Sequence, residues 1–403
     1  MPASPTPDEL TEFLSRAVSE VFVREDLERL LASGERRLRI KQGFDPTRPN
    51  LHIGHTVSLR KLRTLARWGH EIVIIVGDWT TQIGDPTDKD ETRPMMSHED
   101  VLNNARTYLD QFHRIVPREN TRIVSQSEWY ASFGLRQVFE LASRFSAQQL
   151  LAREEFKRRQ TAGVPIPVKD LLYPLLQAYD SVAIEADVEV GGTDQQFNLL
   201  AGRQLQERLG MRPQNVFVTH LLEGLDGERM SKTKPSTAIW ITDPPDEMFG
   251  KVMSLHDDLM PHYYEWATDL PLAEVRSIGA ALARGELHPR DAKERLSRQV
   301  VGELHSPEAA AAAADAFARR FRRRERPAVE PTILERHGEH ECGVLDLILR
   351  LSLAKSASEA RRLLSQGAVR VDEQKATLET RVRMEGKTFL QVGPRTVRQI
   401  SWR

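Results

Sequence analysis

Two histidines three residues apart open a stretch whose residue types suit phosphate binding. His52 and His55 lie in GFDPTRPNLHIGHT, with Gly54 between them. A strand, RLRIKQGF, precedes this loop, and the pattern after it predicts a helix from about His52 to Trp68. The N-terminus of a helix offers unpaired N–H groups and a positive partial charge, imidazoles add donors, and a glycine permits close approach of a ligand. The stretch therefore predicts a nucleotide-phosphate site.

The histidine pair taken alone has two other interpretations. It could be an ordinary solvated helix surface, or part of a zinc site, although no third histidine or carboxylate is near in sequence. His337, His340 and Cys342 in RHGEHEC lack a fourth ligand, and the acidic run DPTDKDE lacks the spacing of a calcium loop. We therefore predict no metal site.

Two further segments carry polar side chains at spacings that suit a binding site. The glycine-flanked loop LDGERMSKTKPS (225–236) gathers charged and hydroxyl groups, and GGTDQQFN (191–198) follows a strand-like run. In YPLLQAYD (173–180), Tyr173, Gln177 and Asp180 are spaced four and three apart, so they share one helical face. Without the neighbouring motifs, Tyr173 and Tyr179 would be read as core aromatics and Asp180 as a helix-end residue.

The elements that must position these residues alternate between strands and helices up to about residue 240. This alternation predicts an α/β domain with a doubly wound, Rossmann-like parallel sheet, whose ligands bind at the carboxyl ends of the strands. Residues 244–325 are predicted to be helical throughout. The expected strands are RLRIKQGF, IVIIVGD, TRIVSQ, DVEVGG and VFVTHL, and the expected helices cover Asp8–Leu31, His52–Trp68, Ser97–His113, Leu135–Gln160, Pro167–Ile184 and a stretch ending at Leu209.

Composition narrows the class of protein. The chain has 403 residues, 57 basic against 58 acidic side chains, and a single cysteine, which excludes an internal disulfide framework and favours a reducing cytoplasm. No apolar run approaches the ~18 residues that a membrane span needs, and the first residues lack a signal-peptide pattern. Residues 343–403 hold 12 basic residues against 6 acidic ones, which indicates an anionic partner such as nucleic acid.

HIGH at 52–55 together with RMSKT at 229–233 resembles the signature of class I aminoacyl-tRNA synthetases. With GFDPT, IGDPT, YPLLQAYD and GGTDQQFN in the same order, the chain is similar over essentially its whole length to bacterial tyrosyl-tRNA synthetases. The resemblance implies tyrosine activation with ATP and Mg²⁺, followed by tyrosyl transfer to the terminal adenosine of tRNA(Tyr). The homodimer of that family would use a surface within about residues 115–190.

The resemblance also assigns roles to single residues. Thr47 and His52 would contact the leaving phosphates, His55 would lie near the nucleotide ring and ribose, and Lys232 would neutralise the departing pyrophosphate. Asp194 would accept from a ribose hydroxyl, Gln195 would lie at the tyrosyl carboxylate, and Asp180 would accept from the phenol hydroxyl. The remaining ATP positions are Gly54, Ser58, Arg229, Ser231 and Thr233, and the remaining tyrosine positions are Asp45, Asp85, Tyr173 and Gln177, of which the last three gather the ammonium.

Four positions depart from the commoner pattern. Lys41 and Gln42 stand just before GFDPT, where one bacterial branch has a tyrosine and a cysteine that contact the phenol and the ribose. Ser58 replaces a threonine, and Arg229 begins the second motif where lysine is usual, which keeps the charge but not the compact ammonium. We therefore predict the branch without the pocket tyrosine, and the second phenol partner stays unidentified.

The C-terminal segment LILRLSLAKSASEARRLLSQGAVRVD resembles the alpha-L RNA-binding motif, a small α+β module. Lys355, Arg361, Arg362 and Arg370 would contact RNA phosphates with salt-dependent affinity. A solvated helix face is the alternative, and the run RRFRRR (319–324) could serve either purpose. The predicted domains are catalytic (1–243), helical and anticodon-side (244–326), a linker (327–342) and the RNA-binding module (343–403).

Two competing functions remain. A synthetase paralogue would keep the active site but change the amino acid or acceptor, and a non-catalytic RNA-binding protein would keep only the fold. Against the second alternative stand the intact HIGH pair, Lys232, Asp180 and Asp194. The basic C-terminal segment argues mildly against the first.

Overall fold

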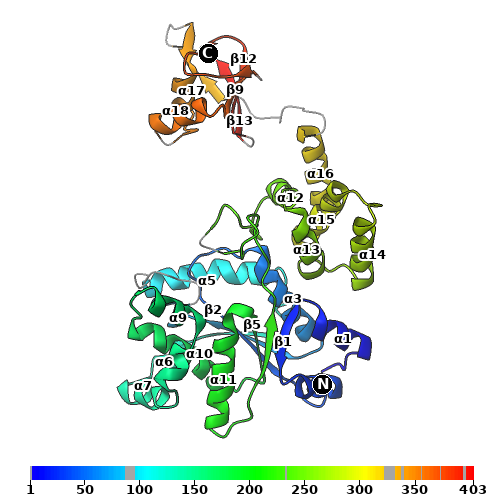
Figure 1. Cartoon of the computed structure of the whole chain (residues 1–403), viewed down its shortest axis with the longest axis vertical. Helices are drawn as coiled ribbons and strands as arrows, with labels where there is room; N and C mark the ends of the chain where they lie inside the picture. The colour runs from blue at the N-terminus through cyan, green and yellow to red at the C-terminus, as the bar shows by residue number, and fades with distance from the viewer. Residues whose placement is uncertain are drawn as a thin grey trace. The chain divides into compact units, whose positions relative to one another are not determined.

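The computed structural model describes residues 2–86, 96–231, 234–321, 332–336, 340–354, 356–372, 374–393 and 396–403. The chain forms two compact units, Met1–Ala314 and Asp315–Arg403 (Figure 1). Among these described residues, every helix is too short or too polar to cross a membrane.

The first unit is built on a six-stranded sheet with the order β1-β6-β5-β2-β3-β4. Strands β2 to β6 run parallel, and β1 pairs antiparallel with β6. Runs such as EIVIIV form these strands because β-branched side chains pack well on a sheet that is covered on both faces. The bounds are β1 Val18–Phe22, β2 Arg39–Phe44, β3 Glu71–Val76, β4 Thr121–Ser125, β5 Val188–Gly192 and β6 Asn215–Thr219.

The predicted helix over Asp8–Leu31 is wrong at its centre. It divides into α1 (Pro7–Ser15), the edge strand β1 and α2 (Arg24–Ser33). Ala17, with φ of 55°, turns the chain between α1 and β1. The short VSEVF segment becomes a strand because β6 offers it a hydrogen-bonding partner, which local sequence does not reveal.

Helices cover both faces of the sheet, as the alternation predicted. Ile72 and Ile74 of β3 pack in a core with α1, α2, α3 (Thr56–Arg67) and α5 (His98–Phe112), whereas Val73 and Ile75 face the opposite layer. Helices α10 (Val168–Ala183) and α11 (Gln196–Arg208) pack side by side there (Figure 1). The fold class is therefore confirmed.

Most predicted helix limits agree with the structure to within a few residues. Helix α5 begins directly after Ser97, in agreement with the predicted start, and the Ser97 hydroxyl caps the helix by accepting from the Asp100 N–H. The helical patterns expected over Leu135–Gln160 form three short helices, α7, α8 and α9. The short helices are α4 Thr80–Ile83, α6 Ser127–Tyr130, α7 Leu135–Ala142, α8 Ala147–Leu151, α9 Glu154–Thr161, and the 3-10 turns η1 Ile53–His55, η2 Thr193–Gln195 and η3 Asp257–Leu259.

The all-helical prediction after Pro244 is confirmed as far as the described residues reach, to Phe321. Helices α12, α13 and α14 each pack against α15. Their bounds are α12 Pro245–Met253, α13 Met260–Trp266, α14 Leu272–Ala283, α15 Pro289–Leu304 and α16 Pro307–Phe321.

The second unit contains a five-stranded sheet, β10-β9-β12-β13-β7, a two-stranded sheet, β11-β8, and two helices around one apolar core. Strands β7 and β8 begin within the stretch 327–342, which was expected to be a linker, so part of that expectation is wrong. A three-residue strand such as β7 has no pattern of its own and forms because β13 pairs with it. The bounds are β7 Thr332–Leu334, β8 Glu341–Gly343, α17 Val344–Arg350, α18 Ala357–Ser365, β9 Val369–Val371, β10 Gln374–Lys375, β11 Arg381–Arg383, β12 Lys387–Val392 and β13 Thr396–Trp402.

Candidate active site

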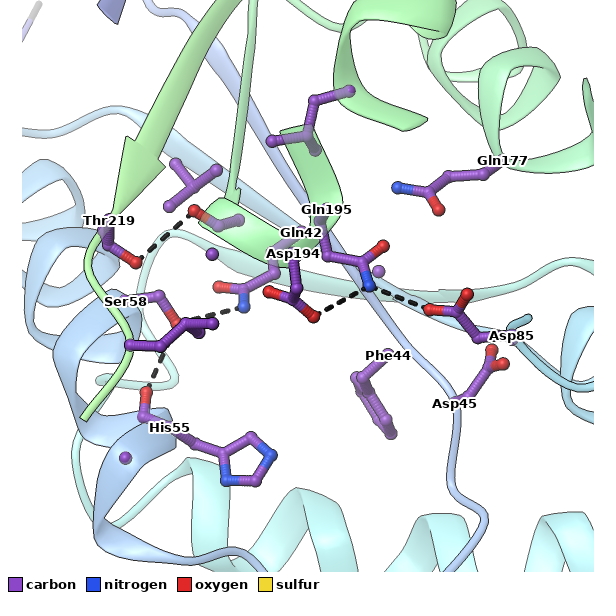
Figure 2. A pocket seen from close by; sticks show the side chains of 18 of the residues that line it. Gln42, Phe44, Asp45, His55, Ser58, Asp85, Gln177, Asp194, Gln195 and Thr219 are labelled. Atoms are coloured by element: carbon purple, nitrogen blue, oxygen red, sulfur yellow. Dashed lines mark hydrogen bonds between the residues drawn. The ribbon is translucent and has the colours of Figure 1, made fainter. Parts of the chain in front are cut away.

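A cavity of about 320 Å³ lies at the carboxyl ends of β2, β3, β5 and β6 (Figure 2). Strands β2 and β5 are neighbours at the point where the chain order of the sheet reverses, which is where open α/β sheets bind ligands. The wall contains fourteen of the predicted site residues: Asp45, Thr47, His52, Gly54, His55, Ser58, Asp85, Tyr173, Gln177, Asp180, Asp194, Gln195, Arg229 and Ser231. Lys232 and Thr233 lie outside the described residues.

The histidine pair is held by a short 3-10 turn, η1, that leads into α3, so the α-helix expected from His52 begins only at Thr56. The two imidazole rings lie 3.8 Å apart, and Nδ1 of His55 is 3.2 Å from the His52 backbone nitrogen. A Cβ at Gly54 would lie 2.9 Å from Nδ1 of His52. Gly54 is therefore needed to seat the His52 ring, beyond the close ligand approach that the sequence suggested.

Gln42 and Ser58 meet next to this turn. The Gln42 side-chain amide donates to the Ser58 hydroxyl at 3.1 Å, and that hydroxyl donates to the His55 carbonyl at 3.2 Å (Figure 2). The two departures from the common motif at these positions thus contact each other. Their side chains form one polar corner of the cavity.

Carboxylates gather around the Gln195 side chain in the cavity. Gln195 donates to Asp85 at 2.8 Å and to Asp194 at 3.1 Å, and Asp45 lies beside Asp85 (Figure 2). Burial raises the pKa of Asp194 to about 6. Arg229 donates to Asp194 at 2.6 Å, so the RMSKT segment contacts the wall of the cavity through its first residue.

Tyr173, Gln177 and Asp180 all face the cavity from α10, which confirms that their spacing places them on one side of the helix. The Tyr173 hydroxyl donates to Asp45 at 3.0 Å, and the Thr80 hydroxyl donates to the other oxygen of Asp45 at 2.8 Å. Because Tyr173 uses its proton on Asp45, its oxygen can accept from a ligand cation.

Asp180 is a buried carboxylate with fixed donors. The Gln126 amide donates at 2.8 Å and the Trp129 indole at 3.1 Å, and the Tyr130 hydroxyl lies 3.4 Å away. Burial raises the pKa of Asp180 to about 7, against the opposing influence of the Lys41 charge. Each carboxylate oxygen has a second lone pair, so Asp180 can take a further hydrogen bond from a hydroxyl ligand, and a ligand without a hydroxyl would leave that acceptor site unused.

Sequence reasoning missed several residues around Asp180 and the histidines. Gln126 directly follows β4, and a polar residue at the carboxyl end of a parallel strand is the signal that could have found it. Tyr108 also lines the cavity, where it stacks on Phe44 at 3.8 Å, and nothing in the local pattern of α5 marks it.

Lys41 is fully buried and forms an ion pair with Glu189.

The second unit presents the predicted RNA-contacting arginines at its surface. Arg361 and Arg362 are exposed on α18, and Arg370 is exposed on β9. Ser356 caps α18 by accepting from the Glu359 N–H at 3.2 Å. Lys355 lies outside the described residues.

A scan against protein-family models matches residues 33–322 to the family described as tRNA synthetases class I (W and Y), and residues 344–387 to the S4 domain. Among curated proteins, the Tyrosine--tRNA ligase of Dehalococcoides mccartyi (strain ATCC BAA-2266 / KCTC 15142 / 195) is 48% identical over 91% of this chain and 92% of its own length. The enzymes of the same name from Geobacter sulfurreducens and Thermotoga maritima are 41% and 39% identical, over 96% and 98% of this chain and 98% of each relative.

Solved structures share the fold at lower identity. A C-terminally truncated mitochondrial tyrosyl-tRNA synthetase of Aspergillus nidulans has a TM-score of 0.63 at 21% identity, covering 77% of this chain and 94% of that one. The Archaeoglobus fulgidus tyrosyl-tRNA synthetase complexed with L-tyrosine has a TM-score of 0.61 at 21% identity, covering 76% and 99%. From the family model and the relatives at 39–48% identity, the chain belongs to the class I tRNA synthetases of the W and Y family, among the bacterial tyrosyl enzymes, and carries an S4 domain.

Proposed function

We propose that this chain is a tyrosine–tRNA ligase, which converts L-tyrosine and ATP to tyrosyl-adenylate and pyrophosphate and then transfers the tyrosyl group to the 3′-terminal adenosine of tRNA(Tyr). The observation that carries the proposal is the buried Asp180 carboxylate in the cavity wall, held by Gln126 and Trp129. A phenol hydroxyl would donate to a further lone pair of this carboxylate, whereas phenylalanine and tryptophan bring no phenolic donor and would leave that acceptor site without its hydrogen bond.

In the proposed first step, an oxygen of the tyrosine carboxylate attacks the α-phosphorus of ATP, and the bond to the pyrophosphate oxygen breaks. Catalysis of such a transfer comes mainly from positioning and from charge stabilisation. Asp85, Tyr173 and Gln177 surround the space proposed for the substrate ammonium, and the carboxylates gathered there favour a cation. Thr47 and His52 are proposed to contact the phosphates.

ATP binding must involve the Arg229–Asp194 ion pair. We propose that the Asp194 carboxylate accepts hydrogen bonds from the ribose hydroxyls of ATP. These hydroxyls would have to displace the Arg229 side chain from Asp194 or bind the carboxylate together with it. Released Arg229 would then be available to the phosphates, together with Ser231 and the predicted Lys232 and Thr233. Mg²⁺ would enter with ATP as part of the substrate, and we propose no resident metal site.

The test is amino-acid-dependent ATP–pyrophosphate exchange with all twenty amino acids, followed by charging of tRNA. We expect exchange only with tyrosine and charging of tRNA(Tyr). Exchange that is strongest with another amino acid would support the paralogue instead, and absence of any exchange would support the non-catalytic alternative.

The domain assignment also remains our proposal: catalysis in residues 1–243, anticodon-side contacts in 244–326, and tRNA binding by the C-terminal S4 module. Because both substrates of the second step are cytoplasmic molecules in bacteria, we propose a cytoplasmic enzyme.

We propose that the enzyme is a homodimer that uses the segment 115–190. Leu135 and Phe139 lie four residues apart on α7 and are 69% and 64% exposed, and Val168 at the start of α10 is 72% exposed. Helices α7 and α10 pack against each other, and a contiguous apolar patch on the surface of a protein marks an interaction site. A second copy of the chain would cover them.

The Leu135→Glu/Phe139→Glu variant is therefore expected to be monomeric, whereas the natural chain is dimeric. Two carboxylates on each side of a symmetric interface repel each other and lose water unfavourably. Sedimentation velocity measures the mass directly. Leu209→Glu, at a 41% exposed leucine at the end of α11, is the matched control and should stay dimeric. Unchanged mass in the α7 variant would remove α7 from the interface.

Arg361→Ala/Arg362→Ala should raise the KM for tRNA in charging by about 10-fold at low salt. Each phosphate contact releases counterions, so losing two contacts should also lower the salt dependence of log KM by about 2. Arg381→Ala/Arg383→Ala, which removes two exposed arginines from β11 of the same unit, is the charge-matched control. An equal effect of both variants would mean that only net charge matters.

A further inference from the structure

A buried ion pair lies directly behind the proposed amino-acid site. The Lys41 ammonium is 2.9 Å from a Glu189 carboxylate oxygen, and the two side chains are 0% and 1% exposed. Lys41 comes from β2 and Glu189 from the neighbouring strand β5. Glu189 contributes to the cavity wall, whereas the residues that line the cavity do not include Lys41.

The pair holds Gln177 at two points. Lys41 donates to the Gln177 backbone carbonyl at 2.9 Å, and the Gln177 side-chain amide donates to Glu189 at 3.2 Å. The third donor of the ammonium goes to the Ser181 hydroxyl at 2.7 Å, and that hydroxyl donates to Glu189 at 3.1 Å. All three ammonium protons are therefore used on α10 or on its partner carboxylate.

The surrounding packing is adapted to this network. Gln214, which precedes β6, donates to the second oxygen of Glu189. A Cβ on Gly202 of α11 would lie 2.7 Å from the Gln214 amide nitrogen and 2.7 Å from the Ser181 hydroxyl. Glycine at this helical position therefore leaves room for the network, although alanine would favour the helix.

We propose that Lys41 and Glu189 are positioning residues for tyrosine recognition: they fix Gln177 against the substrate ammonium and place a positive charge behind Asp180. The inference deepens the proposed function and rests on it. It also gives a task to Lys41, which stands where the resemblance places a tyrosine in one bacterial branch: the Lys41 charge would support Asp180 from behind the pocket and would not contact the phenol.

The charges around Asp180 predict the direction in which its pKa should shift when Lys41 or Glu189 is replaced. Burial is the largest influence on the pKa of Asp180 and raises it, Lys41 lowers it, and Glu189 raises it. Tyr130 of α6 and Tyr173 of α10 also face this carboxylate. The charged groups on the helices that pack against α10 have other partners or are exposed. On α7, Arg136 pairs with Glu140. On α11, Arg203 donates to the Gln214 carbonyl, Arg208 lies over the Phe145 ring, and Glu207 is exposed.

Asp180 must be ionised to accept from both its fixed donors and a phenol, so activity toward tyrosine should fall at low pH. The acid limb is the part of the pH–activity profile in which activity falls as the pH is lowered. Removing the Glu189 charge should move this limb to lower pH, and removing the Lys41 charge as well should move it back to higher pH. A role that is only structural would not produce shifts of opposite sign.

The experiment compares Glu189→Gln and Lys41→Met/Glu189→Gln with the natural enzyme in ATP–pyrophosphate exchange from pH 6 to 9. The double variant leaves no unpaired buried charge, which protects folding. We expect a KM for tyrosine about 10-fold higher in the double variant, a tyrosine-to-phenylalanine ratio of kcat/KM about 10-fold lower, and a KM for ATP within about twofold. The acid limb should lie at higher pH in the double variant than in Glu189→Gln.

Lys61→Met is the matched control, since Lys61 is also a buried lysine in the first unit but does not line this cavity. Gly202→Ala should raise the KM for tyrosine without any change of charge and without moving the acid limb. Equal acid limbs in all variants, or parallel losses for tyrosine, phenylalanine and ATP, would overturn the proposal. Absence of tyrosine-dependent exchange in the natural enzyme would instead refute the proposed function, and this inference with it.

Discussion

Replacement of Asp180 by alanine is expected to lower kcat/KM for tyrosine by about 100-fold in ATP–pyrophosphate exchange, while the KM for ATP changes by less than about twofold. A hydrogen bond to a charged group contributes about 1.5–3 kcal/mol, or roughly 10- to 200-fold in rate. The substitution also leaves the Gln126 and Trp129 donors without their acceptor. Phenylalanine makes no such bond, so its kcat/KM should change little.

The discrimination between tyrosine and phenylalanine should therefore collapse in Asp180→Ala. The contrasting variant is Asp85→Asn, in the same cavity, because we propose that Asp85 faces the substrate ammonium, which tyrosine and phenylalanine share. We expect Asp85→Asn to impair tyrosine and phenylalanine in parallel. If Asp180→Ala also impaired both in parallel, Asp180 would have to be removed from the phenol-binding role.

Ending the chain at Phe321 should reduce kcat/KM for tRNA charging by about 100-fold or more and leave tyrosine-dependent exchange within about twofold of the full chain. The cavity lies wholly in the first unit, so activation needs nothing from the S4 domain. Charging loses the exposed arginines of α18 and β9, and with them the phosphate contacts that supply much of the affinity for nucleic acid.

The strand pairing in the second unit determines at which residue the truncated chain should end. A cut near residue 340 would leave β7 behind without β13, its partner strand, and an unpaired strand promotes aggregation. Ending at Phe321 removes the whole five-stranded sheet. Normal charging by this truncated enzyme at physiological salt would exclude the S4 module from tRNA binding, and a loss of exchange would mean that the catalytic unit does not fold alone.

Much of the fold and the site could be predicted because the controlling interactions are local. The run IVIIV forms a buried strand because of its own composition. Ser97 caps the helix that follows it, by accepting a hydrogen bond from the N–H of Asp100, three residues later. Tyr173, Gln177 and Asp180 share a cavity wall because 3.6 residues make one helical turn. Motif order along the chain then sufficed to identify the family that the comparisons confirmed.

The elements that were missed depend on partners far away in sequence. VSEVF is a strand because β6 is beside it, and Thr332–Leu334 is a strand because β13 is beside it. The helical patterns over Leu135–Gln160 do form helices, but helical propensity does not mark where one short helix ends and the next begins. Propensity is a weak guide wherever pairing between distant segments supplies the hydrogen bonds.

The sequence by itself determined the fold class, the family and most of the predicted residues that line the cavity, because these follow from local periodicity and from motifs. Only the tertiary structure decided what stands behind those residues. Gln126 reaches Asp180 across 54 positions of chain, and the departure at Lys41, which had no assigned task, pairs with a glutamate on the next strand. Such contacts exist only after the sheet aligns distant strands, because the burial that makes an ion pair or a carboxylate selective is a property of the folded core.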